Sequence, residues 1–387
     1  MEPSDKPALV IDNGSGMVKA GFAGEASPCV EFPSIVGMPK YKKSIKHHNR
    51  DEYDGHDKDT QNPSTTYVGS EAYQKKGVLK LVYPIEHGIV TDWSSMESIW
   101  RHTFDLLRVE PDDRNILLTE APRNPKRNRE KMTEIMFETF GAKGIYIAIQ
   151  GVLSLYASGR TTGVVLDVGD GVSHTIPIYD GYSIDNAINR FDLAGRDVTE
   201  YMQRLLEQQG ISMHTSSEKE IVRKMKEKLC YCATDLDAEA VLYKSKNMTR
   251  KYVLPDGNTI TVGDTMYMAP EVLFNPSLIG KEMLGVHEAV NNSILNSDID
   301  IRKDLYSNIV LSGGTTMIRD FDKKLEHELQ RIIPHNIMPK IVAPAERKYS
   351  VWIGGSILAS LPSFETAWVY NAEYRECGVS IIHQRCV

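Results

Sequence analysis

Two stretches of the chain share one pattern of apolar and polar positions. Residues 8–24 read "ALVIDNGSGMVKAGFAG" and residues 163–181 read "GVVLDVGDGVSHTIPIYDG". In each, an apolar run ends at an Asp, a glycine-rich turn follows, and apolar residues then return at alternate positions. Alternation of this kind around a glycine turn predicts a β-hairpin. We therefore expect hairpins with first strands at 8–11 and 164–166, and a second strand of the later copy at 172–179.

Helical patterns lie between and after these repeats. The stretch "RDVTEYMQRLLEQQG" places Val198, Met202, Leu205 and Leu206 on one face and predicts a helix that stops at Gly210. The stretch "SSEKEIVRKMKEKLCYCA" predicts a helix that begins with a capping box of Ser217 and Glu220. The simplest interpretation of the charged side of this helix, which includes Lys226 and Glu227, is that it faces solvent.

Two further segments combine an apolar run with paired glycines. "NIVLSGGTTMI" at 308–318 predicts a strand that enters a glycine turn, and "RKYSVWIGGSILASL" at 347–361 predicts a glycine pair that leads into an apolar helix. Paired glycines allow a ligand to approach the backbone closely, but they are also common packing devices. Both interpretations remain open for each segment.

The glycine tips of the two repeats are suited to phosphate. Without a Cβ, the backbone N–H groups of Gly14, Gly16, Gly169 and Gly171 can approach an anion closely. Asp12 and Asp167 end the first strands, where a carboxylate can hold Mg²⁺ through water. Either repeat alone could be a good turn former, but the duplication favours a clamp that holds a triphosphate from both sides. Neither repeat is a Lys-containing P-loop or a dinucleotide fingerprint.

Composition narrows the class of protein. A chain of 387 residues is long enough for two or more core-bearing lobes. Its net charge of −7 argues against a general affinity for nucleic acid or anionic lipid. It has no apolar run near the roughly 20 residues of a membrane span and no secretory signal pattern, so we expect a cytosolic protein. The five cysteines show no disulfide framework or zinc spacing, and Cys230 and Cys232 fall in a helical pattern that would point them apart.

Several longer motifs resemble the actin family, in order and over nearly the whole chain. They are Asp12 to Gly16 with Lys19, "YPIEHGIVTDW" at 83–93, "LLTEAP" at 117–122, "QGVLSLYASGRTTG" at 150–163, "DLAGRDVT" at 192–199, "KEKLCY" at 226–231, "LSGGTTM" at 311–317 and "ERKYSVWIGGSILASL" at 346–361. The resemblance implies an α/β, actin-like (ribonuclease-H-like) ATPase fold with two duplicated lobes, or four subdomains, around a nucleotide cleft. ATP with Mg²⁺ or Ca²⁺ is then the expected cofactor.

The resemblance also implies a role for particular residues. The expected catalytic residues are Gln150 and His174, which would orient the attacking water, with Asp12 and Asp167, which would hold the metal through its water shell. The phosphate contacts would come from Gly14, Ser15, Gly16, Lys19, Gly169, Asp170, Gly171 and Val172. The adenosine pocket would be lined by Lys226, Glu227, Gly314, Met317 and Lys348.

The resemblance divides the chain into four subdomains. The first large one comprises 1–33, 84–157 and 350–387, and the small outer one comprises 34–83 with a long polar loop at 38–67. The second large one comprises 158–193 and 282–349, and the second small one comprises 194–281.

The function that the resemblance implies is that of a cytoskeletal protein of the cytoplasm. It would bind Mg-ATP, assemble with itself into filaments or related polymers, and hydrolyse ATP slowly after assembly. Actin-binding proteins such as profilin would contact a groove at Tyr182, Leu358 and Leu361. The alternatives are a non-polymerising actin-like subunit of a larger complex and a small-molecule kinase of the same fold.

The sequence departs from the family pattern in several places. The loop at 38–67 is longer and more polar than is usual, and its His47, His48 and His56 leave a metal site as an alternative to a solvated loop. Lys281 lies in the segment 278–281 that forms a cross-strand plug in the family, so it must stay exposed or find a carboxylate. The N-terminus has only Glu2 and Asp5 where an acidic cluster is usual, which argues against myosin binding. Val168 and Ile318 replace residues near the nucleotide.

Overall fold

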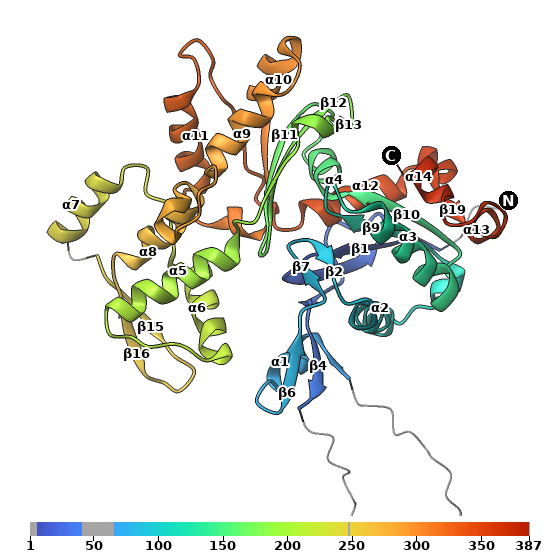
Figure 1. Ribbon diagram of the computed structural model, residues 1–387, viewed down its shortest axis with the longest axis horizontal. Coiled ribbons are helices and arrows are strands. Elements are labelled where there is room, and N and C mark those ends of the chain that lie inside the picture. Colours follow the sequence, from blue (N-terminus) through green and yellow to red (C-terminus); the bar gives the residue numbers. More distant parts are fainter. Residues whose placement is uncertain (1–5, 41–65, 247, 387) are drawn as a thin grey trace, which may run out of the picture.

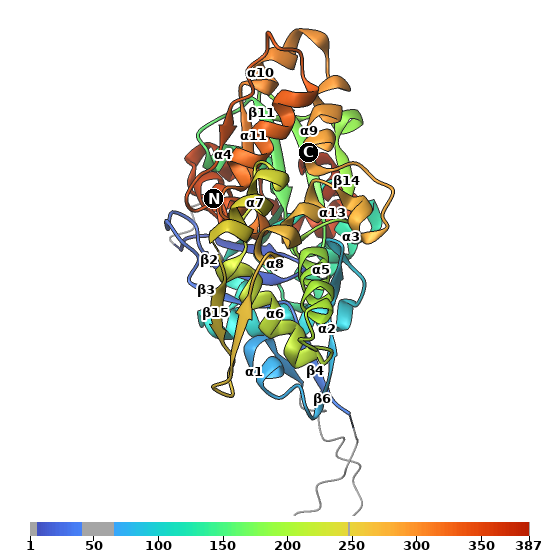
Figure 2. The ribbon, with the colours of Figure 1, turned by 90° about the vertical axis from the view of Figure 1, so that its left-hand side faces the viewer.

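The computed structural model describes residues 6–40, 66–246 and 248–386, and it shows two α/β lobes side by side (Figure 1). The first lobe is built on a six-stranded sheet in the order β19-β10-β9-β1-β2-β3. The second is built on a six-stranded sheet in which β13-β12-β11-β17-β18 follow one another and β14 pairs with β12. Seen edge-on, the molecule is narrower, and helices α5 and α6 lie in front of the first lobe (Figure 2).

The two sheets repeat one arrangement. In the first, β1 (Leu9–Asn13) forms a hairpin with β2 (Met17–Phe22) and runs parallel to β9 (Asn115–Glu120). In the second, β11 (Gly163–Val168) forms a hairpin with β12 (Ser173–Tyr179) and runs parallel to β17 (Ile309–Ser312). The repeated pattern in the sequence is therefore a repeated piece of structure, and both predicted hairpins are confirmed.

The remaining strands complete these sheets and form smaller ones. The large sheets also contain β3 (Val30–Pro33), β10 (Gly144–Ile149), β13 (Tyr182–Ser183), β14 (Asn189–Phe191), β18 (Ile341–Val342) and β19 (Val369–Tyr370). The smaller sheets are β4 (Val36–Pro39) with β5 (Tyr67–Val68) and β6 (Leu79–Val82), β7 (Ile85–Glu86) with β8 (Ile89–Val90), and β15 (Arg250–Val253) with β16 (Thr259–Val262).

Helices cover the faces of the sheets and form the outer parts. The first lobe carries α1 (Gly69–Gln74), α2 (Trp93–Leu107), α3 (Lys126–Glu134), α4 (Gln150–Ala157), α12 (Ser350–Ser360), α13 (Asn371–Cys377) and α14 (Ile381–Arg385). The second carries α5 (Gly195–Gln208), α6 (Ser216–Leu229), α7 (Leu236–Lys246), α8 (Thr265–Met268), α9 (Val286–Leu295), α10 (Arg302–Tyr306) and α11 (Phe321–Ile332). The two largest buried apolar clusters follow this division, because each forms the core of one lobe.

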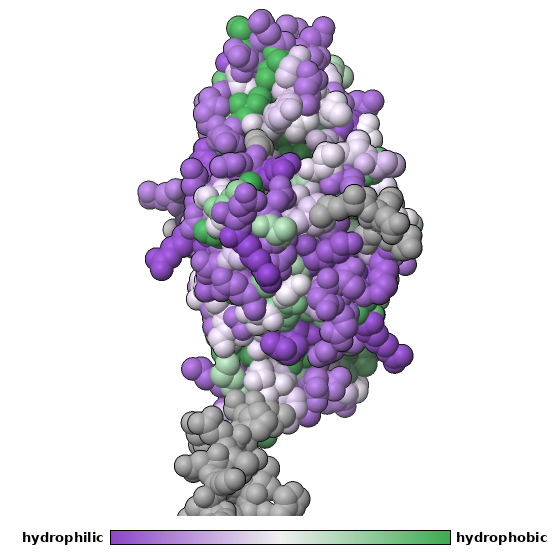
Figure 3. Space-filling model, turned by 90° about the vertical axis from the view of Figure 1, so that its right-hand side faces the viewer, coloured by the Kyte–Doolittle hydropathy of each residue, from purple (hydrophilic) through white to green (hydrophobic). Residues whose placement is uncertain are grey.

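The surface is mainly polar on the face drawn in Figure 3, where apolar residues occur in small groups. Within the described ranges, no helix is both long and apolar enough to cross a membrane.

Four local predictions were wrong. Helix α6 is capped by Thr215, whose hydroxyl accepts the N–H of Glu218, and not by a box at Ser217 and Glu220. That helix ends at Leu229, so Cys230 and Cys232 lie beyond it, and both are buried in the core of the second lobe. The helix was predicted to continue because "CYCA" is as apolar as the helical turn before it.

The third error concerns the glycine pair at 354–355, which lies inside α12 and not before a helix. A Cβ at Gly354 would stand 1.8 Å from the carbonyl oxygen of Leu153 in α4. The pair therefore allows two helices to approach closely, which is the packing interpretation. The predicted loop at 38–67 is also shorter at its ends, since Met38 and Pro39 belong to β4 and Tyr67 to β5. Its residues 41–65, with His47, His48 and His56, lie outside the described residues, as do Glu2 and Asp5.

Candidate functional site

The tips of the two hairpins face each other across the two lobes. A Cβ at Gly16 would lie 2.8 Å from the Cβ of Asp170, and a Cβ at Gly171 would lie 3.2 Å from the Cβ of Ser15. At the base of the first tip, a Cβ at Gly14 would lie 2.7 Å from the carbonyl oxygen of Met17. Glycine is therefore required by close contacts here, and the predicted phosphate loops are brought together as the duplication indicated.

Asp12 lies at the centre of a hydrogen-bond network behind the first tip. Its side chain is almost fully buried, and one carboxylate oxygen lies 3.2 Å from Nζ of Lys19. The other oxygen accepts the hydroxyl of Thr119 at 2.8 Å and the Nε2 amide of Gln150 at 3.3 Å. Three of the predicted site residues, Asp12, Lys19 and Gln150, thus lie in direct contact.

Asp167 occupies the matching place in the second lobe. Its backbone pairs with His174 on β12 and with Ser312 on β17. Burial raises the pKa of this carboxyl to about 6, the nearby Asp12 adds to the rise, and a hydrogen bond from Ser312 and the charge of Lys19 oppose it. Two carboxylates on facing strands supply the oxygen ligands that Mg²⁺ and Ca²⁺ prefer, and a cation between them would relieve their mutual repulsion.

His174 is buried beside Asp167 with unused hydrogen-bonding capacity. Only 1% of the residue is exposed, and in the described part of the chain neither ring nitrogen has a hydrogen-bond partner. Burial lowers its pKa to about 3, and the charge of Arg190 acts in the same direction. A buried polar group is normally satisfied, so these nitrogens indicate a place for a water molecule or a ligand.

The backbone of the second tip is fixed by the segment that starts α5. The carbonyl oxygen of Gly169 accepts the hydroxyl of Thr315 at 2.7 Å and the N–H of Gly195 at 3.0 Å. The guanidinium of Arg196 lies 3.2 Å from the Asp170 carboxylate. Val172 is buried and ends this tip.

The residues predicted for the adenosine pocket are partly brought together. Lys226 is buried, its ammonium donates to the carbonyl oxygen of Gly195 at 2.7 Å, and burial lowers its pKa while Asp170 opposes this. Glu227 is exposed and pairs with Arg223 at 2.5 Å. The burial of Lys226 contradicts a solvated-face interpretation at that position, whereas Glu227 lies exposed on the same helix.

The rest of that set lies at the end of β17 and before α12. Gly314 begins a 3-10 turn, η7 (Gly314–Met317), directly beside Thr315, and Met317 is 42% exposed. The segment before α12 joins this turn because Arg347 donates to the carbonyl oxygen of Thr316 at 2.9 Å. Lys348, the next residue, forms an ion pair of 2.7 Å with Glu31 on β3 of the first lobe.

Comparison with known protein families decides the class. The family model described as actin matches residues 4–387. The chain belongs to the actin family. Its two lobes therefore form the actin-like ATPase fold, in which ATP with a divalent metal is the general ligand.

Lys281 is a departure from the actin family pattern that the structure accommodates. Its ammonium lies 2.7 Å from Oδ1 of Asp197 in α5 and 2.6 Å from the carbonyl oxygen of Asp192. Of the two expected outcomes for this lysine, exposure or a carboxylate partner, the structure shows the carboxylate partner. The preceding turn, η5 (Pro276–Ile279), leaves Leu278 38% exposed.

Several residues around the site were not singled out from the sequence. They are Asn13, Thr119, Ser312, Gly195 and Thr315, and all lie within the motifs that carry the resemblance to the actin family. Thr119 donates to Asp12, and both Thr315 and Gly195 donate to the carbonyl oxygen of Gly169. Ser312 pairs with Asp167 across neighbouring strands, and Asn13 donates to Thr119. A polar residue at the end of an apolar strand, as in "LLTE", is the signal that could have identified Thr119.

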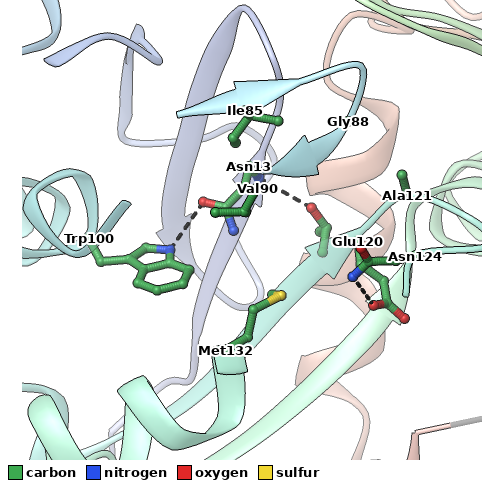
Figure 4. Close-up of a pocket in the computed structure, with 10 residues that line it drawn as sticks. Asn13, Ile85, Gly88, Val90, Trp100, Glu120, Ala121, Asn124 and Met132 are labelled. Carbon is green, nitrogen blue, oxygen red and sulfur yellow. Dashed lines mark hydrogen bonds between the residues drawn. The ribbon is translucent and has the colours of Figure 1, made fainter. Parts of the chain in front are cut away.

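A small pocket lies behind the first tip. Its lining is Asn13, Ile85, Gly88, Val90, Trp100, Thr119, Glu120, Ala121, Asn124 and Met132 (Figure 4). The indole N–H of Trp100 donates to the side-chain oxygen of Asn13 at 3.2 Å, and the amide of Asn124 donates to Glu120 at 2.9 Å. The pocket thus borders the network of Asp12 through Asn13 and Thr119.

Proposed function

We propose that this protein binds ATP with a divalent cation between its two hairpin tips, assembles with itself, and hydrolyses ATP slowly after assembly. The main support for the proposal is that the two hairpin tips meet. Gly16 lies so close to Asp170, and Gly171 so close to Ser15, that a side chain at either glycine would collide with its neighbour. Two glycine turns that face each other, each preceded in the sequence by a strand carboxylate, Asp12 or Asp167, fit a cation and a polyphosphate.

The cation would be held through water by Asp12 and Asp167, and Lys19 would contact phosphate beside it. When bound, the cation supplies neutralisation of the phosphate charge. The backbone N–H groups of both tips would contact phosphate oxygens, together with Ser15 and Asp170. Lys226, Glu227, Gly314, Met317 and Lys348 would line the adenosine pocket.

Gln150 and His174 would orient the water that attacks the terminal phosphate. Neither is a strong base, because Gln150 carries a neutral amide and burial lowers the pKa of His174 to about 3. Phosphoryl transfer to water depends more on alignment and charge neutralisation than on a strong base. Hydrolysis should therefore be slow in the monomer and should accelerate only when assembly improves the alignment.

Assembly with copies of this chain is the partner interaction that we propose, in the cytoplasm as part of a cytoskeleton. Regulators such as profilin would use the groove near Tyr182, Leu358 and Leu361. Tyr182 is 73% exposed, Leu361 is 45% exposed and Leu358 is half-buried, so apolar surface is available there.

A non-polymerising actin-like subunit is the second candidate, and one observation favours it. Lys281 is engaged with Asp197 of its own chain, so its segment is held back from a cross-strand contact. A small-molecule kinase has no comparable observation in its favour.

Sedimentation of the purified protein in Mg-ATP and salt separates these candidates. We expect a pellet and phosphate release that follows pelleting, with polymers visible by electron microscopy. A protein that binds ATP but stays in the supernatant at high concentration would be the non-polymerising subunit. Phosphate transfer to an added sugar or other small molecule would indicate the kinase.

The long polar loop and Lys281 also make a prediction for polymer form. We expect a twist, strand spacing or lateral association unlike that of an ordinary two-stranded actin filament, and poor copolymerisation with ordinary actin. Ordinary helical parameters with free copolymerisation would show that neither departure alters the contacts between subunits.

A further inference from the structure

Thr119 lies where three segments of the first lobe meet. It is the next-to-last residue of β9, which runs parallel to both β1 and β10. The carboxyl ends of these parallel strands lie at one edge of the sheet, so Thr119 lies beside Asp12 of β1 and beside Gln150, which follows β10. Only 2% of Thr119 is exposed.

The hydroxyl of Thr119 uses its whole hydrogen-bonding capacity on the site. It donates to Oδ1 of Asp12 at 2.8 Å. It accepts the backbone N–H of Asn13 at 3.2 Å and the Nε2 amide of Gln150 at 3.3 Å. A hydroxyl has one hydrogen to donate and two lone pairs that accept, so no capacity remains for another partner.

These bonds determine which end of the Gln150 amide faces inward. Asp12 is an acceptor, and the Thr119 hydroxyl donates its only hydrogen to Asp12, so both present lone pairs to Gln150. The amide nitrogen must therefore point at them, and the carbonyl oxygen Oε1 is left to accept a hydrogen bond from elsewhere. An attacking water needs such an acceptor.

We propose that Thr119 is a positioning residue that fixes the Asp12 carboxylate for the cation and the Gln150 amide for water. The inference rests on the proposed function, since it assigns a task within the same site. Thr119 does not itself contact the reacting atoms in this account. It acts through Asp12 and Gln150, and the Asn13 N–H ties the phosphate loop to the same hydroxyl.

The test compares Thr119→Val, which keeps the shape of the side chain and removes the hydroxyl, with Thr119→Ser, which keeps the hydroxyl. The matched control is Thr103→Val, because Thr103 is fully buried in α2 and its hydroxyl donates only to the carbonyl oxygen of Ile99 at 2.9 Å. Thr119→Ala replaces Thr119→Val if the latter does not fold. The readouts are the dissociation constants of the monomer for Mg²⁺ and Ca²⁺ with ATP present, the melting temperature, and phosphate release after assembly.

We expect Thr119→Val to weaken cation binding several-fold and to slow phosphate release by about tenfold, since small displacements of positioned groups reduce rates strongly. Thr119→Ser should restore both, and Thr103→Val should lower only the melting temperature. Equal behaviour of the two valine variants, or a serine variant as impaired as Thr119→Val, would overturn the inference. Cation affinity in the monomer tests it even if the wild-type protein neither assembles nor hydrolyses ATP.

Discussion

The side chains at this site differ in how much of their hydrogen-bonding capacity is filled. Beside Asp12, the hydroxyl of Thr119 makes three hydrogen bonds, whereas both ring nitrogens of His174 have no partner in the region that the structure describes. The first arrangement is what holds a group still, and the second is what leaves room for water or a ligand. The contrast separates the residues that position from those that would contact the reactants.

Replacement of Gln150 by Ala tests the residue closest to the chemistry. An amide that orients water acts on the transition state and contributes little to ground-state affinity, so phosphate release after assembly should fall by at least about tenfold. The affinity for ATP should change little. Gln209→Ala is the control, because Gln209 bonds to Asp264 and Thr265 away from the site. Equal losses of ATP binding and turnover in Gln150→Ala would contradict the assignment.

The buried His287 makes stability depend on pH. Burial lowers its pKa below the ordinary value near 6.5, with Lys324 and Arg331 acting in the same direction and Glu288 and Glu328 opposing it. As the pH falls below about 6.5, the unfolded chain takes up a proton at this site before the folded chain does. The free energy of unfolding should therefore decrease, by at most about 1.4 kcal/mol per pH unit for this residue.

Denaturant unfolding between pH 7 and pH 5 measures this slope. His287→Phe removes the titrating group and keeps a ring beside Phe274, whose centroid lies 5.9 Å from that of His287. We expect a flatter pH dependence in this variant than in the wild type. Identical slopes, or stability that rises as the pH falls, would count against the assignment.

At the scale of elements, the sequence pattern predicted those helices and hairpins whose formation depends on residues close together in the chain. The hairpins of β1 with β2 and β11 with β12 follow from alternation around a glycine turn, and α5 follows from its apolar stripe and its glycine stop. The glycine pair in α12 was misplaced because its cause is the backbone of α4, which no local pattern reveals. Helix α6 was predicted to include Cys230 and Cys232, because a buried turn and a buried helix have a similar apolar composition.

The segment that contains Lys281 makes a prediction of its own. In Lys281→Met the Asp197 carboxylate loses a cation at 2.7 Å, which should lower the free energy of unfolding by about 1 kcal/mol for a partly exposed pair. The same change removes a charge that resists burial between subunits, so the concentration needed for assembly should fall. Stability and assembly should thus move in opposite directions.

The control is Lys323→Met, because the Lys323 side chain in α11 is 69% exposed and pairs at 2.6 Å with Asp320, the residue before that helix. It should leave assembly unchanged. If Lys281→Met assembled no more readily than Lys323→Met, Lys281 would have no part in restraining the contact between subunits.

At the scale of the whole molecule, the sequence predicted the two halves of the site better than their connections. The duplicated pattern was enough to predict that Asp12 and Asp167 belong to facing hairpins. The contacts of Gly169 with Thr315 and Gly195, and of Asp12 with Thr119, join segments more than twenty residues apart through strand pairing and helix packing. Such contacts depend on tertiary structure, and for that reason Thr119 and Thr315 were not predicted.

The two lobes meet at the hairpin tips, so the stability of the whole molecule should depend on what lies between them. A ligand that binds only the native state stabilises it by about 2.7 kcal/mol at a hundredfold excess over its dissociation constant. Gly16→Val should abolish this gain, since a side chain there would meet the Cβ of Asp170 at 2.8 Å.

The melting temperature with and without ATP and divalent cation is the most direct test of the proposed clamp. We predict that verified removal of both lowers the melting temperature of the wild-type protein by several degrees, that adding Mg-ATP restores it, and that Gly16→Val melts at one temperature in both conditions. A wild-type melting temperature that does not change after verified removal would contradict the account.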